Sequence, residues 1–169
     1  MSKRTDCESA LVRAVWEHYR EHGRRHLPWR RQVTPYRVLV SEIMLQQTQV
    51  DRVVPKYQEF LRAFPSVRDL AAAPLRDVLQ LWQGLGYNRR ARYLHEAAKC
   101  VVLEHASRFP KTYHALRALP GVGPYTAGAI MAFAFNVPVG LIETNVRTVY
   151  LHHCFPRREQ VRDSELMPY

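Results

Sequence analysis

The sequence predicts an all-α protein, because apolar residues recur at helical spacing and no segment shows the pattern of a strand. No stretch alternates apolar and polar residues for long enough to support a sheet, and no Asn-Gly hairpin signal occurs. Proline and glycine residues separate the helical segments. The chain has 169 residues, of which 47% are hydrophobic, and this fits one domain with a sizeable core.

The expected helices follow one another along the chain. The first, over about residues 8–21, is predicted by an apolar stripe that ends before Gly23 and consists of Leu11, Val12, Val15, Trp16 and Tyr19. Thr34-Pro35 is an N-cap followed by proline at the first helical position, which predicts a helix to about Thr48. Ser66, followed by Asp69 three residues later, predicts the start of another helix. Further helices are expected over residues 75–82, 89–105, 112–118 and 124–135, with another start at 163–164.

Composition narrows the function classes. The formal net charge is +10, from 25 Lys+Arg against 15 Asp+Glu, and 21 of the 25 are arginine, whose planar fork suits phosphate. This excess indicates a nucleic-acid partner, although solvated arginine-rich faces would produce the same count. No run approaches the roughly 20 apolar residues of a membrane span, and the N-terminus lacks the apolar core of a secretory signal. We therefore expect a cytoplasmic, nucleoid-associated protein.

The segment Leu119–Gly128, which reads LPGVGPYTAG, is the most informative stretch. Gly121 and Gly123 allow a sharp turn, and Pro124 fits the first turn of the following helix. With the short helix before it, the segment is interpreted as a helix-hairpin-helix, whose backbone N–H groups can bind a phosphate without reading sequence. A plain tight turn between packed helices is the alternative.

With this hairpin, the chain resembles the helix-hairpin-helix base-excision glycosylases, and among them the MutY-type adenine DNA glycosylases. The matching segments, in order, are Leu27–Arg30, Pro35-Tyr36, Ser41–Val50, Trp82–Tyr87, Arg90–Arg92 and Leu119–Ala127. The likeness extends over about residues 8–150. It implies a helical bundle core with a catalytic cleft, in which the N-terminal helix (about residues 8–22) belongs to a second lobe.

The resemblance also assigns catalytic roles. Glu42 lies in an apolar run, where a desolvated carboxyl has a raised pKa and can act as a general acid; a solvent-facing Glu is the alternative. The family's catalytic acid is at this position. Glu143 replaces the family's usual Asp and would stabilise positive charge on the sugar, or would simply favour a helix N-terminus. Asn145 would cap the helix or contact the backbone of the damaged nucleotide. Tyr125 occupies the position of the lysine nucleophile in bifunctional relatives, so the resemblance implies a monofunctional enzyme.

Other residues are expected to contact DNA. Tyr87, on a glycine-rich turn, would fill the gap left by an extruded base, with Gln46 and Gln47 facing the opened pair; a core aromatic is the alternative for Tyr87. The remaining expected DNA contacts, mostly to phosphate, are Arg90, Leu119, Gly121, Val122, Gly123 and Thr126. The expected pocket for the extruded purine consists of Arg25, Leu27, Trp29 and Arg30.

Two familiar parts have no counterpart in the 169 residues: a four-cysteine iron–sulfur module and a C-terminal domain that inspects 8-oxoguanine. We interpret these two differences as a sign that the chain is a fragment of a longer protein. A naturally short variant is the alternative. Cys7, Cys100 and Cys154 form no CxxC pair and are expected to be reduced thiols, with no metal held by side chains. A monovalent cation at the hairpin carbonyls is implied.

The expected function is excision of adenine mispaired with 8-oxoguanine or guanine, by a monomer acting on double-stranded DNA. Two alternatives stay open. One is a thymine or uracil mismatch glycosylase of the same fold, and the other is a catalytically impaired DNA-binding fragment.

Overall fold

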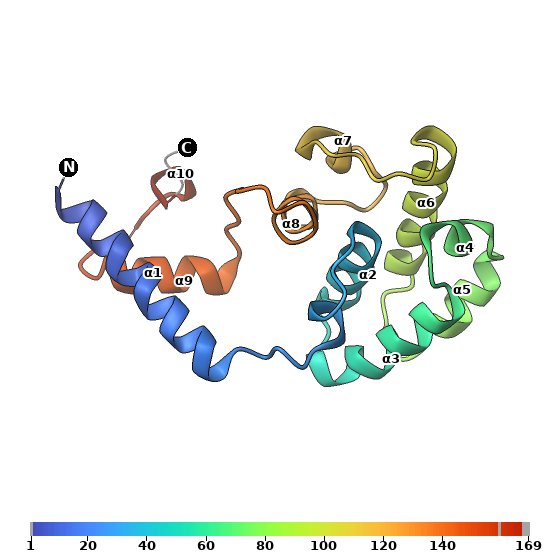
Figure 1. Cartoon of the computed structure of the whole chain (residues 1–169), viewed down its shortest axis with the longest axis horizontal. Coiled ribbons are helices and arrows are strands. Elements are labelled where there is room, and N and C mark those ends of the chain that lie inside the picture. The colour runs from blue at the N-terminus through green and yellow to red at the C-terminus, as the bar shows by residue number, and fades with distance from the viewer. Residues whose placement is uncertain (1, 159, 167–169) are drawn as a thin grey trace. The chain divides into compact units, whose positions relative to one another are not determined.

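The computed structural model describes residues 2–158 and 160–166, which fall into two compact units. Unit 1 combines the N-terminal residues to Arg25 with the segment from Gly140 onward, and unit 2 spans His26–Val139 (Figure 1). Every regular element of the described residues is helical, so the all-α prediction is confirmed. No helix among these residues is long and apolar enough to cross a membrane.

Unit 2 is built around α2 (Pro35–Leu45), which packs against α3 (Val50–Ala63), α6 (Arg89–Glu104), α8 (Pro124–Ala129) and the π-helical segment η2 (Ile130–Ala134). A second group, α4 (Val67–Ala72) and α5 (Leu75–Trp82), packs against α6 (Figure 1). Large apolar side chains without solvent contact fill the space between these helices, among them Leu39, Met44, Phe60, Trp82 and Leu94. Close packing of these side chains fixes the positions of α2 and α6, and the candidate site lies at the ends of these helices.

Local capping explains where several helices begin. The Thr34 hydroxyl accepts a hydrogen bond from the Arg37 amide at 3.3 Å, ahead of Pro35. Ser66 and Asp69 form a reciprocal capping box at the start of α4. Both expected starts are confirmed, because a cap needs only residues within one turn of each other.

Two differences from the expected helices concern α2 and α3. The helix from Pro35 ends at Leu45 rather than near Thr48, because Gln46 leaves the helical region with a ψ of 114° and Gln47 follows with a φ of +53°. Helix α3 was not predicted from sequence, and it contains an internal proline, Pro55. Its buried Val53, Tyr57 and Phe60 nevertheless follow helical spacing. The remaining elements of unit 2 are η1 (Pro28–Arg30) and α7 (Tyr113–Arg117).

Unit 1 contains α1 (Ser2–His22), which packs against α9 (Thr144–Cys154), and the short α10 (Asp163–Leu166). Arg147 links α9 to the C-terminal segment, because its guanidinium pairs with Asp163 at 2.7 Å and donates to the Val161 carbonyl. Leu11 is buried, whereas the other members of the predicted apolar stripe of α1 are exposed. The expectation of reduced thiols is wrong for Cys154, which is disulfide-bonded, and holds for Cys100.

Candidate active site

Glu42 is the titratable group of unit 2 whose environment best fits acid catalysis. It lies on α2 between the buried Ser41 and Ile43, and its own side chain is half-buried. Burial raises the pKa of Glu42 to about 7. No hydrogen bond or ion pair to its carboxylate is recorded among the described residues, so no donor compensates the ionised form. A carboxyl group in this state carries a proton near neutral pH and can donate it.

One turn after Glu42, α2 ends in an exposed turn, here called the glutamine turn (residues 46–48). Gln46 and Gln47 are both exposed. The φ of +53° at Gln47 is unusual for a residue with a side chain and costs about 1 kcal/mol or more. The Thr48 hydroxyl donates to the Gln46 carbonyl at 3.1 Å. The turn thus presents two amide side chains to solvent in a strained but defined conformation.

A second exposed turn lies between α5 and α6 and is here called the tyrosine turn (residues 84–87). Gly84 and Gly86 have φ values of +91° and +72°, and Tyr87 has a φ of +49°. The indole N–H of the buried Trp82 donates to the Gly86 carbonyl at 3.1 Å. The Tyr87 side chain is 67% exposed, so the core-aromatic alternative does not hold for it.

Arg90, in the first turn of α6, connects these two turns. Its guanidinium donates to the carbonyls of Ile43, Met44 and Gln46, to the Thr48 hydroxyl, and to the carbonyls of Leu85 and Gly86. The residue is only 9% exposed, and its Nε is buried without a recorded partner. The expected phosphate contact of Arg90 therefore needs correction, because a buried guanidinium with its two terminal nitrogens occupied cannot reach a DNA backbone.

The hairpin runs from α7 through residues 118–123 into α8. Gly121 has a φ of +72°, and a Cβ there would lie 2.6 Å from Cβ of Tyr93, so the position requires glycine. A Cβ on Gly123 would meet nothing within 4 Å, which leaves open space beside this backbone. No backbone acceptor is recorded for the amides of Gly121 and Gly123. These two donors are therefore available to an external anion.

The side chains of the other hairpin residues face inward. Leu119, Val122 and Thr126 are 2%, 5% and 2% exposed, so they can contact DNA through backbone atoms but not through their side chains. Backbone contacts are what the sequence analysis expects of this hairpin, and Thr126 packs in the core because it lies on the inner face of α8. Tyr125 is 41% exposed on the same helix.

The four residues of the expected purine pocket do not form one exposed set. Leu27 is buried, and Trp29 packs edge-on against Tyr57 with ring centroids 5.4 Å apart. Arg30 is exposed in unit 2. Arg25 belongs to unit 1, where its guanidinium lies 5.3 Å from the centroid of the Tyr19 ring. Trp29 thus packs against the core of unit 2.

Glu143 and Asn145 also belong to unit 1 and lie at the start of α9. The Glu143 carboxylate accepts hydrogen bonds from the amides of Asn145 and Val146 at 2.8 and 3.1 Å, and from the Asn145 side chain at 3.3 Å. Glu143 is therefore the N-cap of α9. The same bonds fix the orientation of the carboxylate and leave part of its acceptor capacity free.

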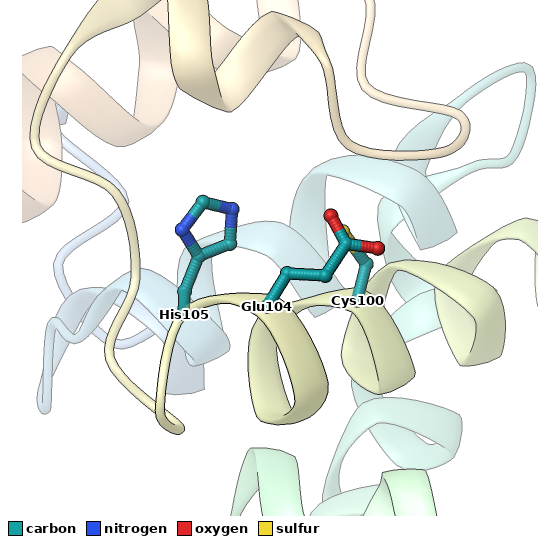
Figure 2. A group of neighbouring side chains, drawn as sticks. All are labelled: Cys100, Glu104 and His105. Carbon is teal, nitrogen blue, oxygen red and sulfur yellow. The ribbon is translucent and has the colours of Figure 1, made fainter.

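The C-terminal end of α6 carries a group of potential metal ligands that the sequence analysis does not predict. Cys100, Glu104 and His105 each offer one ligand atom within 4.8 Å of the others (Figure 2). Spacing of four and five residues along a helix was the available signal. The Cys100 thiol is hydrogen-bonded to Glu104, which contributes with burial to its raised pKa. Tetrahedral zinc needs ligand atoms roughly 3.5 Å apart, so these side chains would have to move before binding it, and we assign no metal to them.

The described cysteines do not fit the iron–sulfur module that the resemblance implies. Cys100 is a free thiol in unit 2 and Cys154 is disulfide-bonded in unit 1. An iron–sulfur cluster of this class needs four thiolates. The described cysteines cannot hold such a cluster by themselves.

The order of these features matches a known family. A family model described as HhH-GPD superfamily base excision DNA repair protein matches residues 40–166. The chain belongs to this superfamily. The matched range contains the C-terminal half of α2 with Glu42, both exposed turns, the hairpin and the start of α9.

Within the HhH-GPD superfamily, the chain is similar to adenine DNA glycosylases. It is 42% identical over 135 residues to that of Buchnera aphidicola subsp. Baizongia pistaciae, covering 80% of this chain and 38% of the relative. It is 45% identical over 130 residues to that of Mycolicibacterium smegmatis, covering 76% and 44%. The chain thus spans less than half the length of these relatives.

A solved structure of a thermostable thymine-DNA glycosylase shares the fold. Its TM-score is 0.81 with 28% sequence identity, over 86% of this chain and 67% of that one. The helix-hairpin-helix glycosylase fold expected from sequence is therefore confirmed.

Proposed function

We propose that this chain is the catalytic core of a monofunctional DNA glycosylase, which hydrolyses the N-glycosidic bond of adenine mispaired with 8-oxoguanine or guanine in base excision repair. The observation that carries the proposal is Glu42, a half-buried carboxyl group with a pKa of about 7, one turn before the exposed glutamine turn. The similarity to adenine DNA glycosylases supports adenine as the target.

In the proposed reaction, the Glu42 carboxyl donates its proton to the adenine base. The bond between the sugar C1′ and the base nitrogen then breaks, and its electron pair leaves with the adenine. Positive charge develops on the sugar, and water adds to C1′ while its proton returns to the Glu42 carboxylate. The products are free adenine and an abasic site.

Glu143 would stabilise the positive charge on the sugar, and Asn145 would hold the nucleotide backbone. These two roles rest on the sequence resemblance. The N-cap bonds of Glu143 hold its carboxylate in one orientation, which the role needs. A hydroxyl rather than an amine at Tyr125 means that this position cannot form a Schiff base, so strand cleavage by that route is not expected.

Double-stranded DNA with a mismatched or oxidised base pair is the proposed partner. The free amides of Gly121 and Gly123 would bind a backbone phosphate, and Tyr87 would occupy the space left by the extruded base. A monovalent cation at the hairpin carbonyls remains an expectation. We also propose that residues 1–169 form one catalytic core in which the N-terminal helix belongs to a second lobe.

The test is single-turnover excision on duplexes with adenine opposite 8-oxoguanine or guanine, followed by alkali to cleave abasic sites. We expect alkali-dependent cleavage with the wild-type chain and none with Glu42→Gln. Glu59→Gln, which changes an exposed carboxylate paired with Lys56, is the matched control and should retain the rate. Cleavage without alkali would contradict the monofunctional assignment.

A thymine or uracil mismatch glycosylase is the second candidate, favoured by the fold similarity to a thymine-DNA glycosylase. The same assay on guanine–thymine and guanine–uracil duplexes separates the two. Excision of thymine or uracil but not adenine would replace the first proposal. Binding without excision of any of these bases, in both wild type and Glu42→Gln, would leave a DNA-binding fragment.

A further inference from the structure

Two of the six hydrogen bonds of Arg90 go to peptide groups that precede strained residues. One Nη1 bond goes to the Gln46 carbonyl, and the next residue, Gln47, has a φ of +53°. One Nη2 bond goes to the Gly86 carbonyl at 3.2 Å, and the next residue, Tyr87, has a φ of +49°. Arg90 therefore binds the peptide group in front of each left-handed residue.

Both turns need this support because neither Gln nor Tyr favours the left-handed region. Such residues persist only where neighbouring groups hold them. Arg90 makes a further bond in each turn, to the Thr48 hydroxyl at 3.1 Å and to the Leu85 carbonyl at 2.9 Å. The guanidinium carbon also lies 5.5 Å from the centroid of the Tyr87 ring. One side chain thus contacts the backbone of both turns and the ring that one of them presents.

Only arginine can make this set of bonds. Its planar fork offers donors in several fixed directions, whereas a lysine ammonium is a single, strongly hydrated point. Among the described residues Arg90 has no carboxylate partner, so carbonyl dipoles, the Thr48 hydroxyl and the rings of Trp82 and Tyr87 offset the burial of its charge. Burying a charge is costly, and this cost indicates a specific use of the residue.

We propose that Arg90 is a positioning residue that couples the glutamine turn to the tyrosine turn, so that Gln47 and Tyr87 meet a mismatched base pair as one preformed unit. This inference rests on the proposed function for its DNA partner. It assigns Arg90 no contact with DNA. Its effect on binding is selectivity for the mismatch, through the conformation of the two turns.

The first experiment needs no DNA and measures amide hydrogen exchange in Arg90→Lys. We expect exchange to rise about tenfold or more in residues 46–48 and in residues 84–88 together, because charged hydrogen bonds to both turns are lost. Arg76→Lys, an exposed arginine on α5, is the matched control and should change neither turn. Faster exchange in one turn alone, or in neither, would overturn the coupling.

A second variant keeps the inference testable if Arg90→Lys does not fold. Gln47→Asn places a residue that tolerates the left-handed region in the glutamine turn. If Arg90 couples the turns, exchange should slow in residues 84–88 as well as in residues 46–48. Slowing confined to residues 46–48 would overturn the coupling.

The DNA experiment separates positioning from phosphate binding. Losing a phosphate contact lowers the slope of log affinity against log salt by about 0.9. For Arg90→Lys we expect an unchanged slope and about a tenfold loss of preference for an adenine–8-oxoguanine duplex over a matched duplex. A lower slope with preserved preference would overturn the inference. If the wild-type chain shows no preference, the proposed function fails, while the exchange result still decides whether Arg90 couples the turns.

Discussion

Replacing Glu42 by glutamine should stabilise the folded chain, and the gain should depend on pH. The carboxyl has a pKa of about 7 in the folded state against an ordinary value of 4.5, because burial disfavours its ionised form. Each pKa unit corresponds to about 1.4 kcal/mol, so ionising Glu42 costs the folded state about 3 kcal/mol more than the unfolded chain. That is a large fraction of the 5–15 kcal/mol by which domains are typically stable.

The sign follows from which state binds more protons. Between pH 4.5 and 7 the folded state keeps the Glu42 proton while the unfolded chain has lost it, so wild-type stability falls as pH rises through this window. Glutamine does not titrate. The advantage of Glu42→Gln should therefore be close to zero near pH 4, grow between pH 4.5 and 7, and level off at about 3 kcal/mol above pH 7.

Urea unfolding at several pH values measures this difference directly, with tryptophan fluorescence and circular dichroism compared to check that unfolding is two-state. Glu59→Gln, which removes an exposed ion pair with Lys56, is the control and should change stability by less than about 1 kcal/mol. A gain for Glu42→Gln that does not vary with pH, or a loss at pH 8, would refute the argument that desolvation of Glu42 raises its pKa.

Three further predictions follow from the same structure. The single-turnover rate of adenine excision should fall as pH rises through about 7, because Glu42 must be protonated to donate; a rate that rises through this range would exclude it as the acid. Gly121→Ala should destabilise the chain by about 2–4 kcal/mol, from its positive φ and the contact with Tyr93, whereas Gly123→Ala should cost less than about 1 kcal/mol in thermal unfolding. Tyr87→Ala should leave stability within about 0.5 kcal/mol but reduce the preference for mismatched DNA in binding assays, and equal loss on matched DNA would contradict its role.

The parts of the fold that sequence predicts correctly depend on local interactions. Thr34 and Ser66 cap helices through hydrogen bonds to residues three positions ahead, so the signal and the structure lie within one turn. The structure ends α2 earlier than expected, because the backbone leaves the helical region at Gln46 and Gln47, where no glycine or proline marks the end in the sequence. That turn is held by Arg90, more than forty residues away, and no local pattern contains this information.

For the candidate site, sequence identified residues more reliably than their roles. Glu42 was selected from its apolar neighbours and the family resemblance, and its burial agrees with the expected acid. Arg90 is an expected DNA contact because of its residue type and motif position. Its side chain is buried instead, because the packing of unit 2 turns it inward. Residue type indicates what a side chain can bind, but burial decides which partner it meets.

Sequence patterns and the family resemblance predict the helical fold class, the superfamily, and the positions of the candidate acid and of the glycine-rich hairpin. These depend on periodicity, capping and short motifs, which act over a few residues. The tertiary structure was needed to show that Gln47 and Tyr87 stand on two turns joined by one guanidinium, and that burial raises the pKa of Glu42. Both depend on desolvation and on bonds between distant segments, and these arise only when α2 and α6 pack together.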